Sequence, residues 1–216
     1  MAARVVVEEE ALSRLEELGL TLEIIQRSIL RAEAEAATCT DFDPPTMAGF
    51  TRYGRTVRFL REELVPLGWD YDNPRNLCRT INPSRDFAIV STSGDEATGD
   101  PALNPSTKNP KGYATELAVD RNEQLMFDFG DDSGAVAEIA PDDDQLATWF
   151  LLYRATAEEI KAEISLPSEF EGTSIVDWRE RIILPTFTID ADVPAKRHGD
   201  DEDGTGEYVV EVSRRS

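Results

Sequence analysis

The sequence predicts an α+β fold in which an N-terminal helical hairpin and one further helix pack on a mainly antiparallel β-sheet. Apolar residues recur with helical spacing in the first third of the chain, and short apolar runs separated by turn residues follow from Gly68. With 216 residues, 40% of them hydrophobic, the chain can bury a core of its own. We divide it into a helical hairpin (1–40), an α+β domain (41–190) and an acidic C-terminal tail (191–216) that we expect to be mobile.

The start of the chain is predicted to form two helices. Gly19 is typical of a helix end, and Thr21 is a suitable N-cap for the helix that follows. The apolar faces are expected to consist of Leu12, Leu15 and Leu18 in the first helix and of Leu22, Ile25 and Ile29 in the second. Two amphipathic helices with such a short connection indicate a helical hairpin.

A third helix is predicted over Thr51–Leu64, after a linker that contains Pro44 and Pro45. The spacing of its apolar residues predicts a core face formed by Phe50, Tyr53, Val57, Leu60 and Leu64. Arg52, Arg55 and Phe59 fall on or toward the opposite side of the helix, which predicts an aromatic ring among guanidinium groups on an exposed face. We treat these three residues as a candidate partner-binding patch.

The rest of the fold is predicted to be β-structure. The runs GWDYD, LCRTIN and FAIVST are separated by turn residues, which indicates antiparallel strands. Trp149–Tyr153 and Ile160–Leu166 are predicted to form a β-hairpin, and ERIILPTF a further strand that ends at Pro185.

The composition argues against secreted, membrane and zinc proteins. The first residues, MAARVVVEEE, lack the apolar stretch of a signal peptide or membrane span, so we expect a cytoplasmic location. Cys39 and Cys78 stand apart and are expected to be reduced. His198 is the only histidine, which leaves little material for a histidine base or a zinc site. We therefore predict neither a metal nor a cofactor.

The chain is strongly acidic, with 43 acidic and 22 basic residues and a net charge of −21. Such a charge repels the phosphates of nucleic acids and favours a protein partner with a basic surface. We therefore expect no general nucleic-acid binding. A salt-adapted proteome would also produce this composition, and that alternative stays open.

The acidity is concentrated in residues 127–145, which carry seven acidic and no basic side chains. Carboxylates spaced in this way can mimic phosphates and occupy the basic groove of a protein that handles nucleic acid. The candidate partner-binding residues are Asp128, Asp131, Asp132, Asp142, Asp143 and Asp144. Their spacing does not match a calcium-binding loop, and such runs are most often solvated faces.

Residues 92–112 form the longest segment without a predicted helix or strand. Long irregular loops are commonly functional, and hydroxyl and lysine side chains can bind a phosphate or carboxylate. The candidate ligand-binding residues are Ser93, Asp95, Thr107, Lys108 and Lys111. The segment has no phosphate-binding GxxxxGK[ST] pattern, so a flexible surface loop is the alternative.

The run NEQLMFDFG resembles the short peptide by which bacterial polymerases and repair proteins dock on the sliding clamp. The matching residues are Gln124, Leu125 and Phe127, although Asp128 stands where that peptide carries an aromatic residue. A docking peptide would be extended and accessible. The alternative is a buried strand that contributes its apolar side chains to the core.

The runs FAIVSTSGDEATGD, STKNPKG, NEQLMF, SLPSEF and WRERIILP, spread between about Pro44 and Pro185, resemble a set of uncharacterised proteins encoded on bacterial plasmids and integrative elements. The resemblance implies that the gene travels with mobile DNA, and it implies no catalytic residue.

Together these observations favour a non-enzymatic acidic protein that binds a nucleic-acid-handling partner, as an accessory or anti-defence inhibitor of a mobile element. Two alternatives stay open. One is a replication or repair accessory that docks on the sliding clamp. The other is an enzyme or binder of a small phosphorylated ligand at the 92–112 loop.

Overall fold

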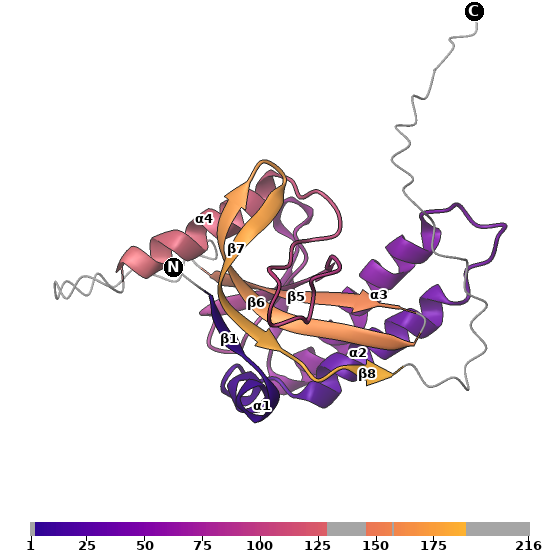
Figure 1. Cartoon of the computed structure of the whole chain (residues 1–216), viewed down its shortest axis with the longest axis horizontal. Coiled ribbons are helices and arrows are strands. Elements are labelled where there is room, and N and C mark those ends of the chain that lie inside the picture. The colour runs from indigo at the N-terminus through magenta and orange to yellow at the C-terminus, as the bar shows by residue number, and fades with distance from the viewer. Residues whose placement is uncertain (1–2, 129–145, 157, 189–216) are drawn as a thin grey trace, which may run out of the picture.

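The structure, a computed structural model, describes residues 3–128, 146–156 and 158–188 and confirms the predicted α+β class (Figure 1). The α-helices are α1 (Glu8–Glu17), α2 (Leu22–Ala36), α3 (Met47–Leu64) and α4 (Tyr113–Asp128), and two short 3₁₀ turns are η1 (Val65–Leu67) and η2 (Pro74–Asn76). The strands are β1 (Arg4–Val6), β2 (Asp70–Asp72), β3 (Arg79–Ile81), β4 (Phe87–Ser93), β5 (Ala147–Ala155), β6 (Glu159–Glu171), β7 (Ser174–Ile183) and β8 (Phe187–Thr188).

These strands form one mixed sheet in the order β1-β7-β6-β5-β4-β3-β2, with β8 paired to β6. Most neighbours are antiparallel, including the predicted β5–β6 hairpin, in which Leu152 lies opposite Glu163. The β4–β5 and β1–β7 pairs are parallel. Because parallel strands need a crossover, α4 lies between β4 and β5 in the chain.

The two predicted N-terminal helices are confirmed, but they do not pack on each other as a hairpin, because α2 packs along α3 and α1 packs against β7. Gly19 follows α1 with a φ of 69°, a left-handed conformation that glycine adopts without steric cost. The hydroxyl of Thr21 caps α2 by accepting a hydrogen bond from the amide of Ile24 at 3.4 Å. Leu15 of α1 and Ile25 of α2 are fully buried in the same cluster as residues of the sheet.

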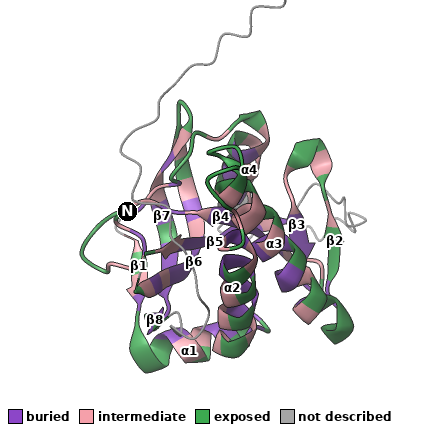
Figure 2. Ribbon diagram, turned by 90° about the vertical axis from the view of Figure 1, so that its right-hand side faces the viewer, coloured by how far each residue is buried: buried purple, intermediate pink, exposed green. Residues whose placement is uncertain are grey.

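The two faces of the sheet are covered by different helices. On one face, side chains of α1, α2 and α3 pack against Ile89, Trp149 and Leu151. On the other, Val119 of α4 packs against Phe150 and its neighbours. This alternation along β4 and β5 follows from the two-residue period of a strand. Figure 2 shows α2 and α3 in front of the sheet, with buried residues on the strands behind them.

Three local features differ from the sequence predictions. Helix α3 begins at Met47 rather than Thr51, and Phe50 in its first turn is 69% exposed because the core contacts of α3 begin further along the helix. Helix α4 was not predicted, because few of its residues are strongly apolar. Strand β1 has only three residues, too few for a periodic signal. The predicted tail, 191–216, lies outside the described residues.

Candidate functional site

A cavity of about 400 Å³ lies at the end of β4, between α3 and the first turn of α4. Strand β3 pairs with β4 only as far as Val90, so Ser91–Ser93 continue past the end of β3. The space beside them is lined by residues of η2, α3 and α4. The cavity therefore occupies the edge of β4 that β3 leaves uncovered.

Lys111 is the central polar residue of the cavity. It is half-buried, and its Nζ donates a hydrogen bond to Oγ1 of Thr92 at 2.8 Å. Its backbone amide donates to the carbonyl oxygen of Thr173 at 2.7 Å, which attaches the residue to the β6–β7 turn. Burial lowers the pKa of the Lys111 amine. No described carboxylate lies within ion-pair distance of this amine.

The first turn of α4 forms a second polar wall. The carbonyl oxygen of Gly112 accepts hydrogen bonds from the amides of Thr115 and Glu116, so the helix begins directly after Lys111. The amides of Tyr113 and Ala114 have no acceptor among the described residues, as is usual in a first turn. Such amides and the helix dipole favour a negative charge at this end of the helix.

The remaining walls combine apolar side chains with a phenol. Leu77, Val90 and Phe150 line the apolar part of the cavity. Burial and the neighbouring Cys78 thiol raise the pKa of Tyr53 to about 12, so this lining phenol is neutral at physiological pH. Neutral Tyr53 can donate or accept a hydrogen bond.

The local charge of the cavity is opposite to that of the protein. Its described lining contains two cations, Lys111 and Arg75, and no carboxylate. By contrast, the described residues as a whole carry 29 acidic and 18 basic side chains. The arrangement can therefore hold a small anion whose apolar portion packs against the cavity wall.

The structure places the predicted loop residues at different points around this site. Of the five candidates, Lys111 alone lines the cavity. The carboxylate of Asp95 accepts hydrogen bonds from the amides of Ala97 and Ser106, at 3.1 and 2.9 Å, and so fixes the loop. The hydroxyl of Thr107 donates to the carbonyl oxygen of Asn109 at 3.0 Å.

The two other loop candidates, Ser93 and Lys108, are joined by a backbone hydrogen bond. The carbonyl oxygen of Ser93 accepts a hydrogen bond from the amide of Lys108 at 3.0 Å. The side chain of Lys108 is exposed, three residues before Lys111. Lys108 and Lys111 therefore differ in environment, because Lys108 is exposed and Lys111 is half-buried in the cavity.

Sequence reasoning missed the groups that complete the site. Tyr53 and Arg75 lie on α3 and η2, far from the loop in sequence, and the amides of Tyr113 and Ala114 belong to the unpredicted helix. The available signal was the run PKGYATE, in which a glycine precedes a helix-forming segment.

The clamp-like run lies on α4, which includes Gln124, Leu125 and Phe127. The two local structures predicted for this run, an extended peptide and a buried strand, are therefore both wrong, because the run forms the last part of helix α4. Asn122 holds the helix on the sheet: its side-chain amide donates to the carbonyl oxygens of Thr148 and Pro167, at 2.9 and 3.2 Å. Gln124 is exposed, and docking on a clamp stays a prediction.

The predicted exposed aromatic patch is wrong, because Phe59 is only 3% exposed. The guanidinium group of Arg31 lies over its ring at 3.8 Å from the centroid, and Arg58 at 5.5 Å. Arg52 pairs with Glu33 at 2.5 Å, and Arg55 pairs with Glu35.

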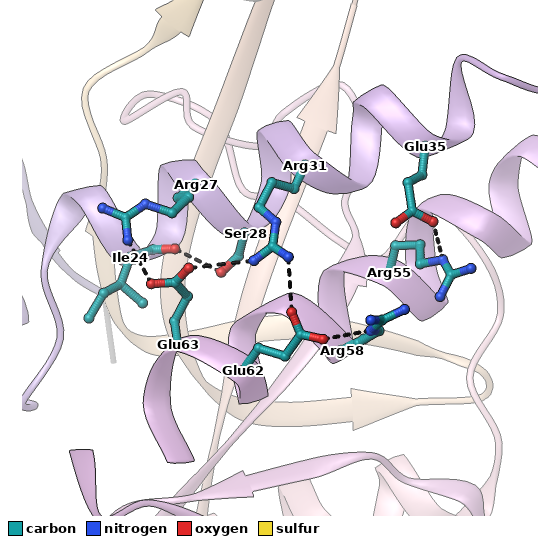
Figure 3. Close-up of polar contacts among 9 residues, drawn as sticks. All are labelled: Ile24, Arg27, Ser28, Arg31, Glu35, Arg55, Arg58, Glu62 and Glu63. Atoms are coloured by element: carbon teal, nitrogen blue, oxygen red, sulfur yellow. Dashed lines mark hydrogen bonds and ion pairs between the residues drawn. The ribbon is translucent and has the colours of Figure 1, made fainter. Parts of the chain in front are cut away.

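Arg31, Arg55 and Arg58 take part in ion pairs that join α2 to α3 (Figure 3). Glu62 of α3 pairs with Arg31 of α2 at 2.9 Å and with Arg58 at 2.7 Å. Glu63 pairs with Arg27 at 2.9 Å. The arginines of this network therefore have carboxylate partners within the protein, and binding of an external partner through Arg52 and Arg55 stays a prediction.

The acidic candidates mostly lie outside the described residues. Asp128 is the last residue of α4, while Asp131, Asp132, Asp142, Asp143 and Asp144 fall within 129–145. In the described part of the chain, no three histidine, cysteine or acidic side chains are grouped to hold a metal ion. In that same part, every helix is too short or too polar to cross a bilayer.

No protein-family model, curated protein or solved structure matches this chain. The chemistry of the site is therefore the basis for a function, since a fold alone does not determine an activity.

Proposed function

We propose that the cavity beside Lys111 binds a small organic anion, a carboxylate or phosphate attached to an apolar body. The observation that carries this proposal is the reversal of charge: a cavity lined by Lys111 and Arg75, with no carboxylate among its described residues, in a chain of net charge −21. An anion would supply the opposite charge that Lys111 lacks.

Desolvation gives the physical reason. Removing an ammonium group from water is costly unless an opposite charge or hydrogen-bond acceptors compensate it, and lysine is rarely buried without a partner. Lys111 has three N–H donors, and only the bond to Thr92 uses one of them among the described residues. A bound carboxylate or phosphate would accept from the others and restore the favourable electrostatics.

The rest of the cavity favours a ligand with an apolar body. The amides of Tyr113 and Ala114 offer further donors to the anionic group, while Leu77, Val90 and Phe150 offer an apolar wall. A volume of about 400 Å³ lies in the range of small-molecule sites and suits a ligand the size of one or two rings.

A thermal-shift comparison of matched ligands tests the proposal. Benzoate and phenyl phosphate carry the anion and the apolar ring, whereas benzamide and phenol carry the ring alone. A ligand that binds only the folded state raises the melting temperature, so the two anions should stabilise the protein and the neutral pair should not. Equal shifts for anions and neutral ligands, or no shift, would contradict it.

A second function, binding of a basic protein partner through the acidic segments, is supported by the distribution of charge. The described residues carry a net charge of −11, so nearly half of the acidic excess belongs to 129–145 and 189–216. Concentrated carboxylates favour association with a basic groove.

Pull-downs from host lysate with the wild type and with a variant carrying Asp142→Asn, Asp143→Asn and Asp144→Asn test this second function. The wild type should retain a nucleic-acid enzyme at low salt and release it at high salt, because screening weakens charge pairing. If the variant retains the same enzyme equally well, the acidic run is not the contact.

A further inference from the structure

Lys111 differs chemically from the other described lysines. The chain has only four lysines, Lys108, Lys111, Lys161 and Lys196. Lys108 is exposed, and Lys161 lies 3.6 Å from a carboxylate oxygen of Glu159. Lys111 is the described lysine that lines the cavity and hydrogen-bonds a neutral hydroxyl instead of a carboxylate. This environment is typical of a lysine that acts as an amine nucleophile.

The cavity also holds the groups that such chemistry needs. A lysine that attacks a carbonyl carbon requires a lone pair on nitrogen and a nearby group that exchanges protons with the carbonyl oxygen. Thr92 is bonded to the amine, and the Tyr53 phenol lines the same cavity. Tyr113 and Ala114, in the first turn of α4, line the same cavity, and the amides of a first turn favour an anionic group.

We propose that Lys111 forms an imine with an aldehyde or 2-oxo acid that carries an anionic group. This inference rests on the proposed function, because the anionic group would occupy the same cavity. The neutral amine attacks the carbonyl carbon, a C–N bond forms as the C=O π bond opens, and one proton passes from the nitrogen to the carbonyl oxygen. The resulting carbinolamine loses its hydroxyl group and the remaining N–H proton together as water, which gives a C=N bond without oxidation or reduction.

The electrostatics support this reaction. Burial lowers the pKa of Lys111, so a larger fraction of this amine is neutral at neutral pH than for an exposed lysine. Below both pKa values, each unit by which the pKa lies lower gives about tenfold more neutral amine. Lys108, in the same loop, provides an internal standard.

Reductive trapping tests the inference. The full chain is incubated with pyridoxal 5′-phosphate, an aldehyde with a phosphate group, reduced with borohydride, digested and analysed by mass spectrometry. Lys111 should be labelled several-fold faster than Lys108, with the excess growing about tenfold for each unit of difference in pKa. Unfolding in urea should abolish the preference, and pyridoxal, which lacks the phosphate, should show less of it. Equal labelling of the two lysines in the folded protein would overturn the proposal.

Two further measurements separate this proposal from the anion-binding function. Benzoate has no carbonyl that forms an imine, so stabilisation by benzoate without labelling of Lys111 overturns the imine and leaves anion binding intact. If benzoate does not stabilise the protein and Lys111 is not labelled in preference to Lys108, both the anion-binding function and the imine are overturned. The variant Lys111→Arg keeps the positive charge, so it should retain stabilisation by benzoate and lose the trapped product.

Discussion

Arg181 and Glu163 form a buried ion pair beneath the 94–112 loop, with Nε of the arginine 2.8 Å from Oε2 of the glutamate. Their side chains are 3% and 0% exposed. The guanidinium group also donates to the carbonyl oxygens of Asp100 and Leu103, at 3.1 and 2.5 Å. The pair therefore attaches the loop that leads to Lys111 to strands β6 and β7.

Replacing one partner of this pair should destabilise the protein strongly. Glu163→Ala leaves the Arg181 guanidinium buried without its counter-charge, which costs about 3 to 5 kcal/mol in comparable pairs. Urea unfolding followed by circular dichroism measures the loss. Glu159→Ala, at a half-exposed ion pair on the same strand, is the matched control and should change stability little. Similar midpoints for both variants would show that the buried pair does not hold the loop.

Asn122 should be required to hold α4 on the sheet. Its side chain donates to the carbonyl oxygens of Thr148 and Pro167 and accepts from the amide of Thr148 at 2.7 Å. Asn122→Ala leaves these buried backbone groups unpaired, at a cost of about 1 to 3 kcal/mol for each unsatisfied group. Chemical denaturation should show this loss, whereas Asn104→Ala, which removes one exposed hydrogen bond, should have a much smaller effect.

Phe59 should behave as a core residue. Because the ring is buried beneath the α2–α3 ion-pair network, Phe59→Ala should lower the free energy of unfolding by about 3 to 5 kcal/mol. Phe42, which is 99% exposed, provides the control, and Phe42→Ala should leave the free energy of unfolding nearly unchanged. Equal free energies of unfolding for the two variants would contradict the burial of Phe59.

Tyr53 should make stability depend on pH in the alkaline range. Its pKa is raised from 10.0 to about 12 in the folded protein, so the folded state keeps a proton that the unfolded state loses. The stabilisation is present below about pH 10 and is lost as the pH rises through about 12. Between about pH 10 and 12, the melting temperature of the wild type should therefore fall more steeply than that of Tyr53→Phe. Parallel curves would mean that the phenol titrates normally.

The sequence predicted the parts of the fold that have clear periodicity. The stripe containing Ile25 and Ile29 and the alternation in the β5–β6 hairpin both reflect one-sided burial, which leaves a pattern in a single chain. Helix α4 leaves a weaker pattern, because only part of it packs on the sheet through residues such as Val119 and Asn122.

The candidate site was predictable only in part. Lys111 was identified because lysines and hydroxyls in a long loop can bind anions. Its burial and its position in one cavity with Tyr53 and Arg75 arise because α3, η2 and the start of α4 pack together. Contacts between segments so far apart in the sequence leave no local pattern. The error at Phe59 has a related cause: helical spacing placed the ring away from the predicted core face of α3, but α2 covers that side of α3 as well.

Calorimetric titration of benzoate into three matched proteins tests the central claim most directly. Lys111→Met replaces the half-buried cation with an apolar side chain of similar length, and Lys108→Met makes the same change of charge at an exposed position of the same loop. The wild type and Lys108→Met should bind benzoate saturably, while Lys111→Met should lose the binding because the charge inside the cavity is gone. Equal affinity in Lys111→Met and the wild type would contradict an anion site at Lys111.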